Sequence, residues 1–197
     1  MSEQPGEQNP ERQSDAERPD TPAPQVYVAS LSDYNAGRLH GAWIEAAVET
    51  GELHAQVQAM LGQSVEPGAE EWAIHDYQGF GPVHLSEYES LETVSRLARG
   101  IAEHGPAFTA WAALAGLNDE RLDDFEDTYR GHWQSVADYA DELLDEVGAT
   151  EVLEQIPSWL QPYVQLDIDG FARDLALGGD IRTVEGDGGV WVFEGRT

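Results

Sequence analysis

Histidines and paired acidic residues are the side chains in this sequence that could bind a metal ion or transfer a proton. The Asp167-Ile168-Asp169-Gly170 segment begins like a calcium-binding loop, but its glycine comes two positions early and the glutamate expected at position 12 is missing. The histidines form neither a His-Glu-x-x-His motif nor another paired spacing typical of zinc sites; they are His40, His54, His75, His84, His104 and His132. The sequence therefore predicts neither a metal site nor a cofactor.

The common nucleophiles are absent or lack their usual motifs. The chain has no cysteine and no lysine, and no serine lies in a Gly-x-Ser-x-Gly motif. It also lacks a Gly-Lys-Ser/Thr phosphate-binding loop. Pairs of carboxylates have little diagnostic value here, because acidic residues are so numerous that some must lie close together. We therefore expect a protein that is not an enzyme.

The arrangement of the acidic residues along one predicted helix is more informative. Between Ser135 and Gly148, which suit the N-cap and the C-terminal stop, apolar residues recur with helical spacing on one face. The opposite face carries only acids, namely Asp138, Asp141, Glu142, Asp145 and Glu146. Three like-charge pairs four residues apart result, and each destabilises the helix by roughly 0.2–0.5 kcal/mol. A helix shaped by solubility alone would contain interspersed basic residues.

A second acidic segment precedes this helix and is predicted to be helical as far as Tyr129. Its periodicity directs Leu122, Phe125 and Tyr129 inward. Its acids are expected mostly on the outside and, like those of the following helix, unneutralised; they are Glu120, Asp123, Asp124, Glu126 and Asp127. Two interpretations of the combined surface remain open. It is either the solvated face of an acidic, halophilic-type scaffold for protein–protein interaction, or a regular array of carboxylates that imitates DNA phosphates.

The elements that must position these residues indicate an α+β fold. Alternating and helical hydrophobic periodicities, together with turn residues, predict strands at 26–29, 39–44 and 72–77, and a terminal hairpin of strands 181–185 and 190–194. Helices are predicted at 51–61 with Thr50 as cap, from Leu91 to Ile101 with Ser90 as cap, at 107–115, up to Tyr129, at 135–147, from Thr150 to Pro157, and at 171–177.

These elements predict an elongated chain of three small domains that follows a tail. Residues 1–24 form an acidic, proline-containing tail that is expected to be disordered. A small α+β domain at 25–84, a helical middle domain at 85–128, and a C-terminal α+β domain at 129–197 with the terminal hairpin would follow.

The net charge limits the possible partners. The chain has 38 acidic and 10 basic residues, a formal net charge of −28 and a pI near 4.1. Direct binding to nucleic acid or to an anionic membrane is disfavoured, and no apolar run reaches the roughly 18 residues that span a bilayer. The N-terminus lacks the features of a signal peptide, so we expect a cytoplasmic protein.

The charge of the chain after the tail can be compared with that of DNA. Residues 25–197 carry 32 of the acids and eight arginines. The resulting net charge matches that of roughly 12 base pairs, or about 40 Å, of duplex DNA.

Three long segments of the sequence resemble the ArdA antirestriction proteins carried by plasmids, transposons and phages; they are residues 26–44, 70–77 and 171–180. The resemblance covers nearly the whole chain after the tail. It implies an elongated, three-domain homodimer that mimics bent B-form DNA and occupies the DNA-binding groove of type I restriction-modification enzymes, in their methyltransferase core. It implies no catalysis and no cofactor.

The antirestriction motif of that family corresponds to residues 122–133 of this chain. The resemblance places this motif in or near the dimer contact, and its candidate residues are Leu122, Phe125, Tyr129, Gly131 and Trp133. Arg130 and His132 are basic departures from an acidic motif. Core packing at helical spacing is the alternative role for Phe125, Tyr129 and Trp133.

Overall fold

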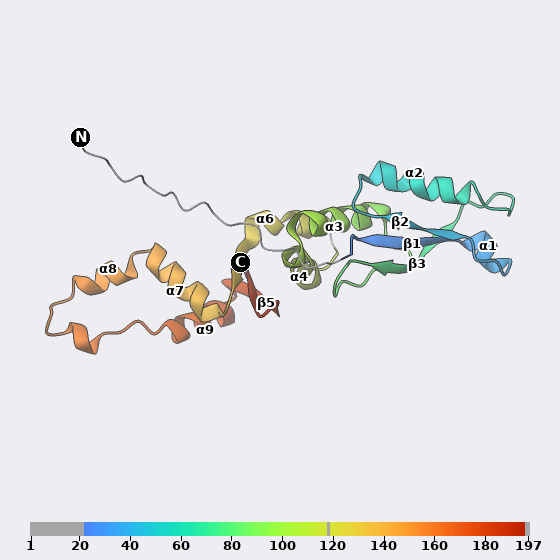
Figure 1. Cartoon of the computed structure of the whole chain (residues 1–197). Coiled ribbons are helices and arrows are strands. Elements are labelled where there is room, and N and C mark those ends of the chain that lie inside the picture. The colour runs from blue at the N-terminus through green and yellow to red at the C-terminus, as the bar shows by residue number, and fades with distance from the viewer. Residues whose placement is uncertain (1–21, 118, 196–197) are drawn as a thin grey trace, which may run out of the picture.

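The computed structural model describes residues 22–117 and 119–195, with the side chains of residues 119 and 120 outside the description. Helices and two small antiparallel sheets follow one another along an elongated molecule (Figure 1), which confirms the predicted α+β class. The predicted tail falls mainly on residues that are not described. Pro24, at its end, is buried, and its carbonyl accepts a hydrogen bond from the Ala46 amide at 3.0 Å.

The first sheet lies at one end of the molecule (Figure 1). Its strands are β1 (Gln25–Ser30), β2 (Gly41–Glu45) and β3 (Trp72–Gln78), in the order β2-β1-β3, and the short helix α1 (Leu31–Asn35) follows β1. Alternate residues such as Val26, Val28 and Ile44 are buried in one core with Leu53 and Val57 of α2 (Thr50–Leu61). Thr50 does not cap α2, because it already lies in the first turn; Glu49 takes the N-cap position without a side-chain hydrogen bond.

Two helices form the middle of the molecule. They are α3 (Leu91–His104) and α4 (Pro106–Ala115), joined by Gly105, whose φ of +63° suits glycine. Ser90 caps α3 as predicted, because its hydroxyl accepts a hydrogen bond from the Thr93 amide at 3.0 Å. The buried side of α3 and the apolar α4 extend the core that starts on the first sheet.

The chain after α4 differs from the predicted helix that would run to Tyr129. It forms α5 (Asp119–Asp123) and α6 (Phe125–Thr128), and Tyr129–Trp133 is strand β4. The strand pairs with β6, and this pairing shifts register between Tyr129 and Gly131. A strand replaces the helix because these residues pair with β6 and Tyr129 packs on the core. Strand β6 lies about 60 positions further along the chain, and helical periodicity does not take such distant partners into account.

The second sheet and the remaining helices complete the chain. The sheet has the order β4-β6-β5 and contains the predicted hairpin of β5 (Ile181–Gly186) and β6 (Gly189–Glu194). Asp187 and Gly188, both with positive φ, form its two-residue turn, as an Asp-Gly pair favours. The helices are α7 (Val136–Glu146), α8 (Ala149–Glu154), the 3-10 helix η1 (Gln161–Tyr163) and α9 (Ile168–Gly178). Among the described residues, no helix is long and apolar enough to cross a membrane.

Candidate partner-binding surface

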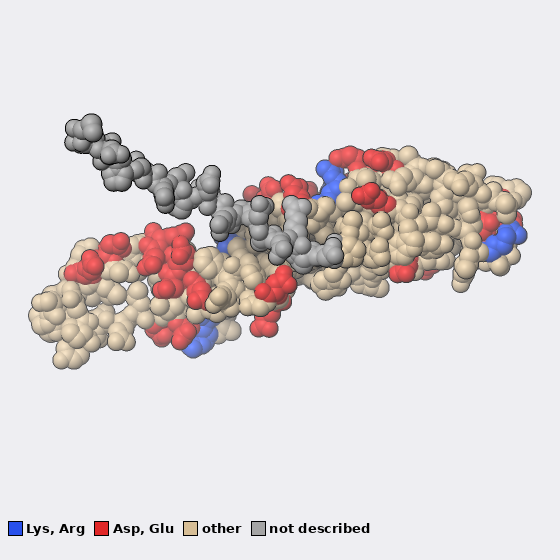
Figure 2. Space-filling model, in the orientation of Figure 1, with Lys and Arg blue, Asp and Glu red and all other residues tan. Residues whose placement is uncertain are grey.

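The α7 acidic face is the set of acids predicted on one side of helix α7. Ser135 fixes the start of the helix, since its hydroxyl accepts a hydrogen bond from the Asp138 amide at 3.2 Å and also contacts the Asp138 carboxylate. All members of the face are exposed, as predicted; they are Asp138, Asp141, Glu142, Asp145 and Glu146. Figure 2 shows acidic side chains gathered over this helix.

The other side of α7 packs on the C-terminal sheet and on α9. Ala140 is fully buried, and Tyr139 meets Trp133 edge-on at 5.5 Å between ring centroids. Val136 and Tyr139 pack against a small core of Ile181, Val190 and Val192. Burial raises the pKa of the Tyr139 phenol. The apolar side therefore holds the helix in place, and the acidic side faces solvent.

The carboxylates of the α7 acidic face have no cationic partner within the described part of the chain. Asp145 accepts only a neutral hydrogen bond, from the Thr150 hydroxyl at 3.1 Å. Unpaired like charges at this spacing repel one another. The face is therefore available to a cationic partner.

The acids of α5 and α6 differ from this pattern. Asp123 lies 3.7 Å from the Arg96 guanidinium on α3, and Glu126 lies 3.9 Å from the His104 imidazole. The expectation that this segment presents only unneutralised carboxylates is therefore wrong for Asp123. Asp127 is exposed and Asp124 is half-buried. The predicted site residue Glu120 lies outside the described side chains.

The candidate motif residues divide between two cores. Leu122 and Phe125 are buried in the main core, where Phe125 stacks on Tyr129 at 5.1 Å and also contacts Phe108 at 5.1 Å. Tyr129 is half-buried, and its burial raises the pKa of its phenol. Trp133 packs on the smaller core around α7. The motif thus contains the residues that join the middle helices to the second sheet.

The remaining motif residues shape strand β4. Gly131 lies at the register shift. Its φ of +110° is a backbone conformation that disfavours residues other than glycine. The indole of Trp133 donates to the Arg130 carbonyl at 3.0 Å. Arg130 itself forms an ion pair with Glu194 on β6, and the His132 ring contacts the Gly186 carbonyl at 3.1 Å. The two basic departures in the motif therefore make contacts within the chain.

Exposed apolar residues between positions 147 and 163, around α8 and η1, were not predicted. We call them the apolar tip; they are Val147, Val152, Trp159 and Tyr163. Trp159 is 72% exposed and Tyr163 is 81% exposed, which is unusual for large aromatic side chains. The sequence signal was two aromatic residues in the proline-containing segment between α8 and α9.

A family model described as antirestriction protein (ArdA) matches residues 26–189. The match covers most of the chain and includes both the α7 acidic face and residues 122–133. The chain belongs to the ArdA family. Membership in ArdA implies an antirestriction function, and so an interaction with restriction enzymes. The ArdA family is one of antirestriction proteins and not of known enzymes. Comparison with curated proteins finds no match.

Proposed function

We propose that this protein protects incoming mobile DNA by mimicking bent B-form DNA. It would compete with DNA for the groove of a type I restriction-modification enzyme, in the methyltransferase core and in the cytoplasm. The observation that carries the proposal is the α7 acidic face, with five exposed carboxylates and no basic partner among the described residues. A groove that binds phosphates offers the arginine and lysine side chains that such a face lacks.

The charge density of this face is close to that of DNA. The residues from Asp138 to Glu146 span about 12 Å of helix at a rise of about 1.5 Å per residue. Five charges over that length correspond to one per about 2.4 Å, compared with one per about 1.7 Å of duplex axis. A basic groove therefore meets a similar electrostatic potential from either ligand.

The elongated shape supports the same proposal. A compact globule of this mass could not spread its charge along a groove, whereas acidic side chains occur in patches along most of the visible length of this molecule (Figure 2). The balance of charge in residues 25–197 equals that of roughly 12 base pairs. No cofactor and no direct contact with nucleic acid are part of the proposal.

The apolar tip supports a homodimer as the active form. Large exposed aromatic side chains are typical of surfaces that another protein covers. The segment that carries these residues includes α8, which lies toward the end of the molecule opposite the first sheet (Figure 1). A second copy bound there would place two elongated protomers end to end and double the length of the acidic surface. Leu122 and Phe125 of the candidate motif are buried within one chain, so their side chains would support such a contact from the interior.

Competition for a methyltransferase core tests the proposal directly. The purified core is bound to fluorescently labelled DNA and titrated with this protein at several salt concentrations. We expect displacement at low salt, with an affinity that falls steeply as salt rises. Failure of the unmodified protein to displace DNA at low salt would overturn competition as the mechanism.

Neutralising the α7 acidic face tests its part in that competition. Conversion of its five acids to Asn or Gln should weaken displacement more than tenfold, because the charges that the groove attracts are removed. The matched control converts five exposed acids elsewhere to Gln, namely Glu45, Glu52, Glu70, Glu71 and Glu87. An equal loss in both variants would favour the evenly acidic scaffold over a shaped mimic.

A further inference from the structure

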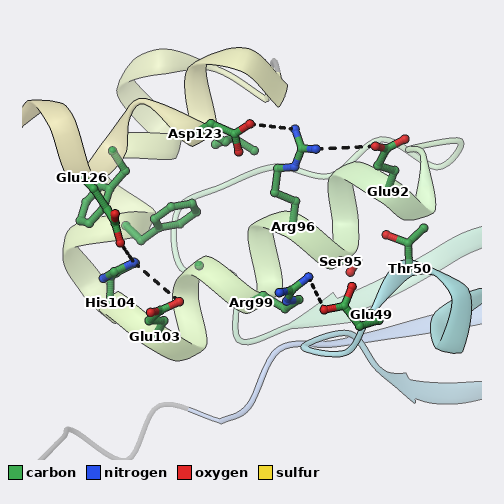
Figure 3. A pocket seen from close by; sticks show the side chains of 14 residues that line it. Glu49, Thr50, Glu92, Ser95, Arg96, Arg99, Glu103, His104, Asp123 and Glu126 are labelled. Carbon is green, nitrogen blue, oxygen red and sulfur yellow. Dashed lines mark ion pairs between the residues drawn. The ribbon is translucent and has the colours of Figure 1, made fainter.

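Three possible metal ligands from two helices converge beside the middle helices. Glu103 and His104 end α3, and Glu126 lies on α6. The His104 Nε2 atom is 3.9 Å from a carboxylate oxygen of Glu103 and 3.9 Å from one of Glu126, and one ligand atom from each residue lies within 4.8 Å of the others. Figure 3 shows both carboxylates directed at the imidazole.

Aromatic packing fixes the imidazole between these carboxylates. The His104 ring stacks on Phe108 at 5.9 Å and contacts Phe125 at 4.7 Å. Only 26% of the His104 side chain is exposed. A ring held in this way presents Nε2 with little loss of conformational entropy when a ligand binds.

The spacing of the three ligand atoms suits an ion better than it suits direct contact. A separation of 3.9 Å is too long for a hydrogen bond, and no hydrogen bond to the His104 side chain occurs among the described residues. An ion in the plane of the three atoms and equidistant from them would lie at most about 2.5 Å from each, and small rotations of the two exposed glutamates would bring this near the 2.0–2.2 Å of zinc–ligand bonds.

The surroundings favour a cation. The C-terminal end of α3, where the helix dipole is negative, lies at the cluster. The nearby Arg99 is 2.8 Å from Glu49, and Arg96 contacts Glu92 and Asp123, so both guanidinium groups have other carboxylate partners. A pocket of about 420 Å³ opens beside the cluster, which leaves room for water ligands.

We propose that Glu103, His104 and Glu126 bind one divalent transition-metal ion such as Zn²⁺ or Co²⁺. One imidazole nitrogen with two carboxylates suits these ions, whereas Ca²⁺ and Mg²⁺ prefer oxygen ligands throughout. The bound ion ties the end of α3 to α6, and α6 leads directly into β4. It therefore strengthens the junction between the middle helices and the second sheet, and it neutralises two carboxylates of the surface.

The test uses the full chain and Co²⁺, whose absorption spectrum reports its ligands, with Zn²⁺ binding measured by calorimetry. We expect one site per chain, and at least a tenfold weaker affinity in Glu126→Gln and in His104→Gln. Glu126→Gln alters an exposed side chain, so it tests the site even if His104→Gln disturbs packing. The matched controls are His54→Gln and Glu87→Gln, which alter exposed residues away from the cluster and should bind as the unmodified chain does.

Two results would overturn the proposal. One is the absence of saturable one-to-one binding of either ion. The other is binding that all four variants share equally, since that is the behaviour of counterions attracted by a highly acidic chain. A melting temperature raised by Zn²⁺ in the unmodified chain, but not in Glu126→Gln, would support the site independently.

Discussion

Asp33, on α1, is a buried carboxylate whose partners come from the segments that follow α1 and α2. The Ser64 hydroxyl donates a hydrogen bond to it, and the Arg38 Nε atom lies 3.5 Å from its other oxygen. The Ser30 hydroxyl accepts a hydrogen bond from the Asp33 amide at 3.3 Å. The hydrogen bond from Ser64 is the largest cause that lowers the pKa of Asp33 below its ordinary value of 3.8, against the opposing effect of burial.

The lowered pKa predicts how the stability of the fold depends on pH. Because Asp33 is more acidic in the folded than in the unfolded chain, its ionised form stabilises the fold at pH values above 3.8, and this contribution is lost as the pH falls through the lower folded-state pKa. Asp33→Asn should therefore reduce the free energy of unfolding at pH 7, and the difference from the unmodified chain should shrink below pH 3.8.

Urea unfolding at pH 7, 5 and 3 measures this difference. Glu87→Gln is the control, because Glu87 is exposed and its substitution should leave the free energy of unfolding almost unchanged. A deficit of Asp33→Asn that stays constant over the whole pH range would contradict a stabilising role for the charge.

The packing of α3 on α4 depends on a glycine within a helix. A Cβ atom at Gly100 would lie 2.3 Å from the Phe108 ring, closer than any normal contact. Glycine usually weakens a helix by roughly 1 kcal/mol relative to alanine. Here it lets Phe108 lie against α3, where the ring also contacts Phe125 at 5.1 Å. The stabilisation from close packing of the two helices thus outweighs the cost of glycine in helix propensity.

A pair of matched substitutions separates these two effects. Gly100→Ala should lower the free energy of unfolding by about 1–3 kcal/mol, because the core around Phe108 is overpacked. Gly51→Ala, in the first turn of α2 with no atom near the added Cβ, should be neutral or stabilising by up to about 1 kcal/mol. Thermal or urea unfolding of both variants measures the contrast, and equal effects would show that propensity dominates at both sites.

A single main core links the parts of the elongated molecule. It contains Val26 of the first sheet, Leu97 of α3, and Phe193 of the second sheet, where the Phe193 ring contacts Trp111 of α4 at 5.1 Å. Continuous packing of this kind resists bending at the junctions, because interiors transmit strain. We expect a rigid body from the first sheet to the second, as the proposed competition for a DNA-binding groove would require.

The apolar tip predicts the state of association. The unmodified chain should sediment as a dimer at micromolar concentration, and a variant with Trp159→Ser and Tyr163→Ser should sediment as a monomer, since central aromatic residues dominate most interfaces. Leu177→Ser is the control, because Leu177 is 80% exposed but belongs to α9 and not to the tip. Sedimentation velocity measures the outcome, and an unmodified chain that is monomeric would contradict the proposed homodimer.

The sequence alone determined the features that depend on local spacing. The capped helix with acids on one side, the Asp-Gly hairpin and the strands of the first sheet follow from short-range periodicity and turn chemistry, so they could be predicted. Only the tertiary structure decided that Tyr129 lies in a strand, that Asp123 meets Arg96, and that Glu126 faces His104. Those contacts join residues more than 20 positions apart. They arise from the way whole elements pack, and periodicity within one segment carries no information about its partner.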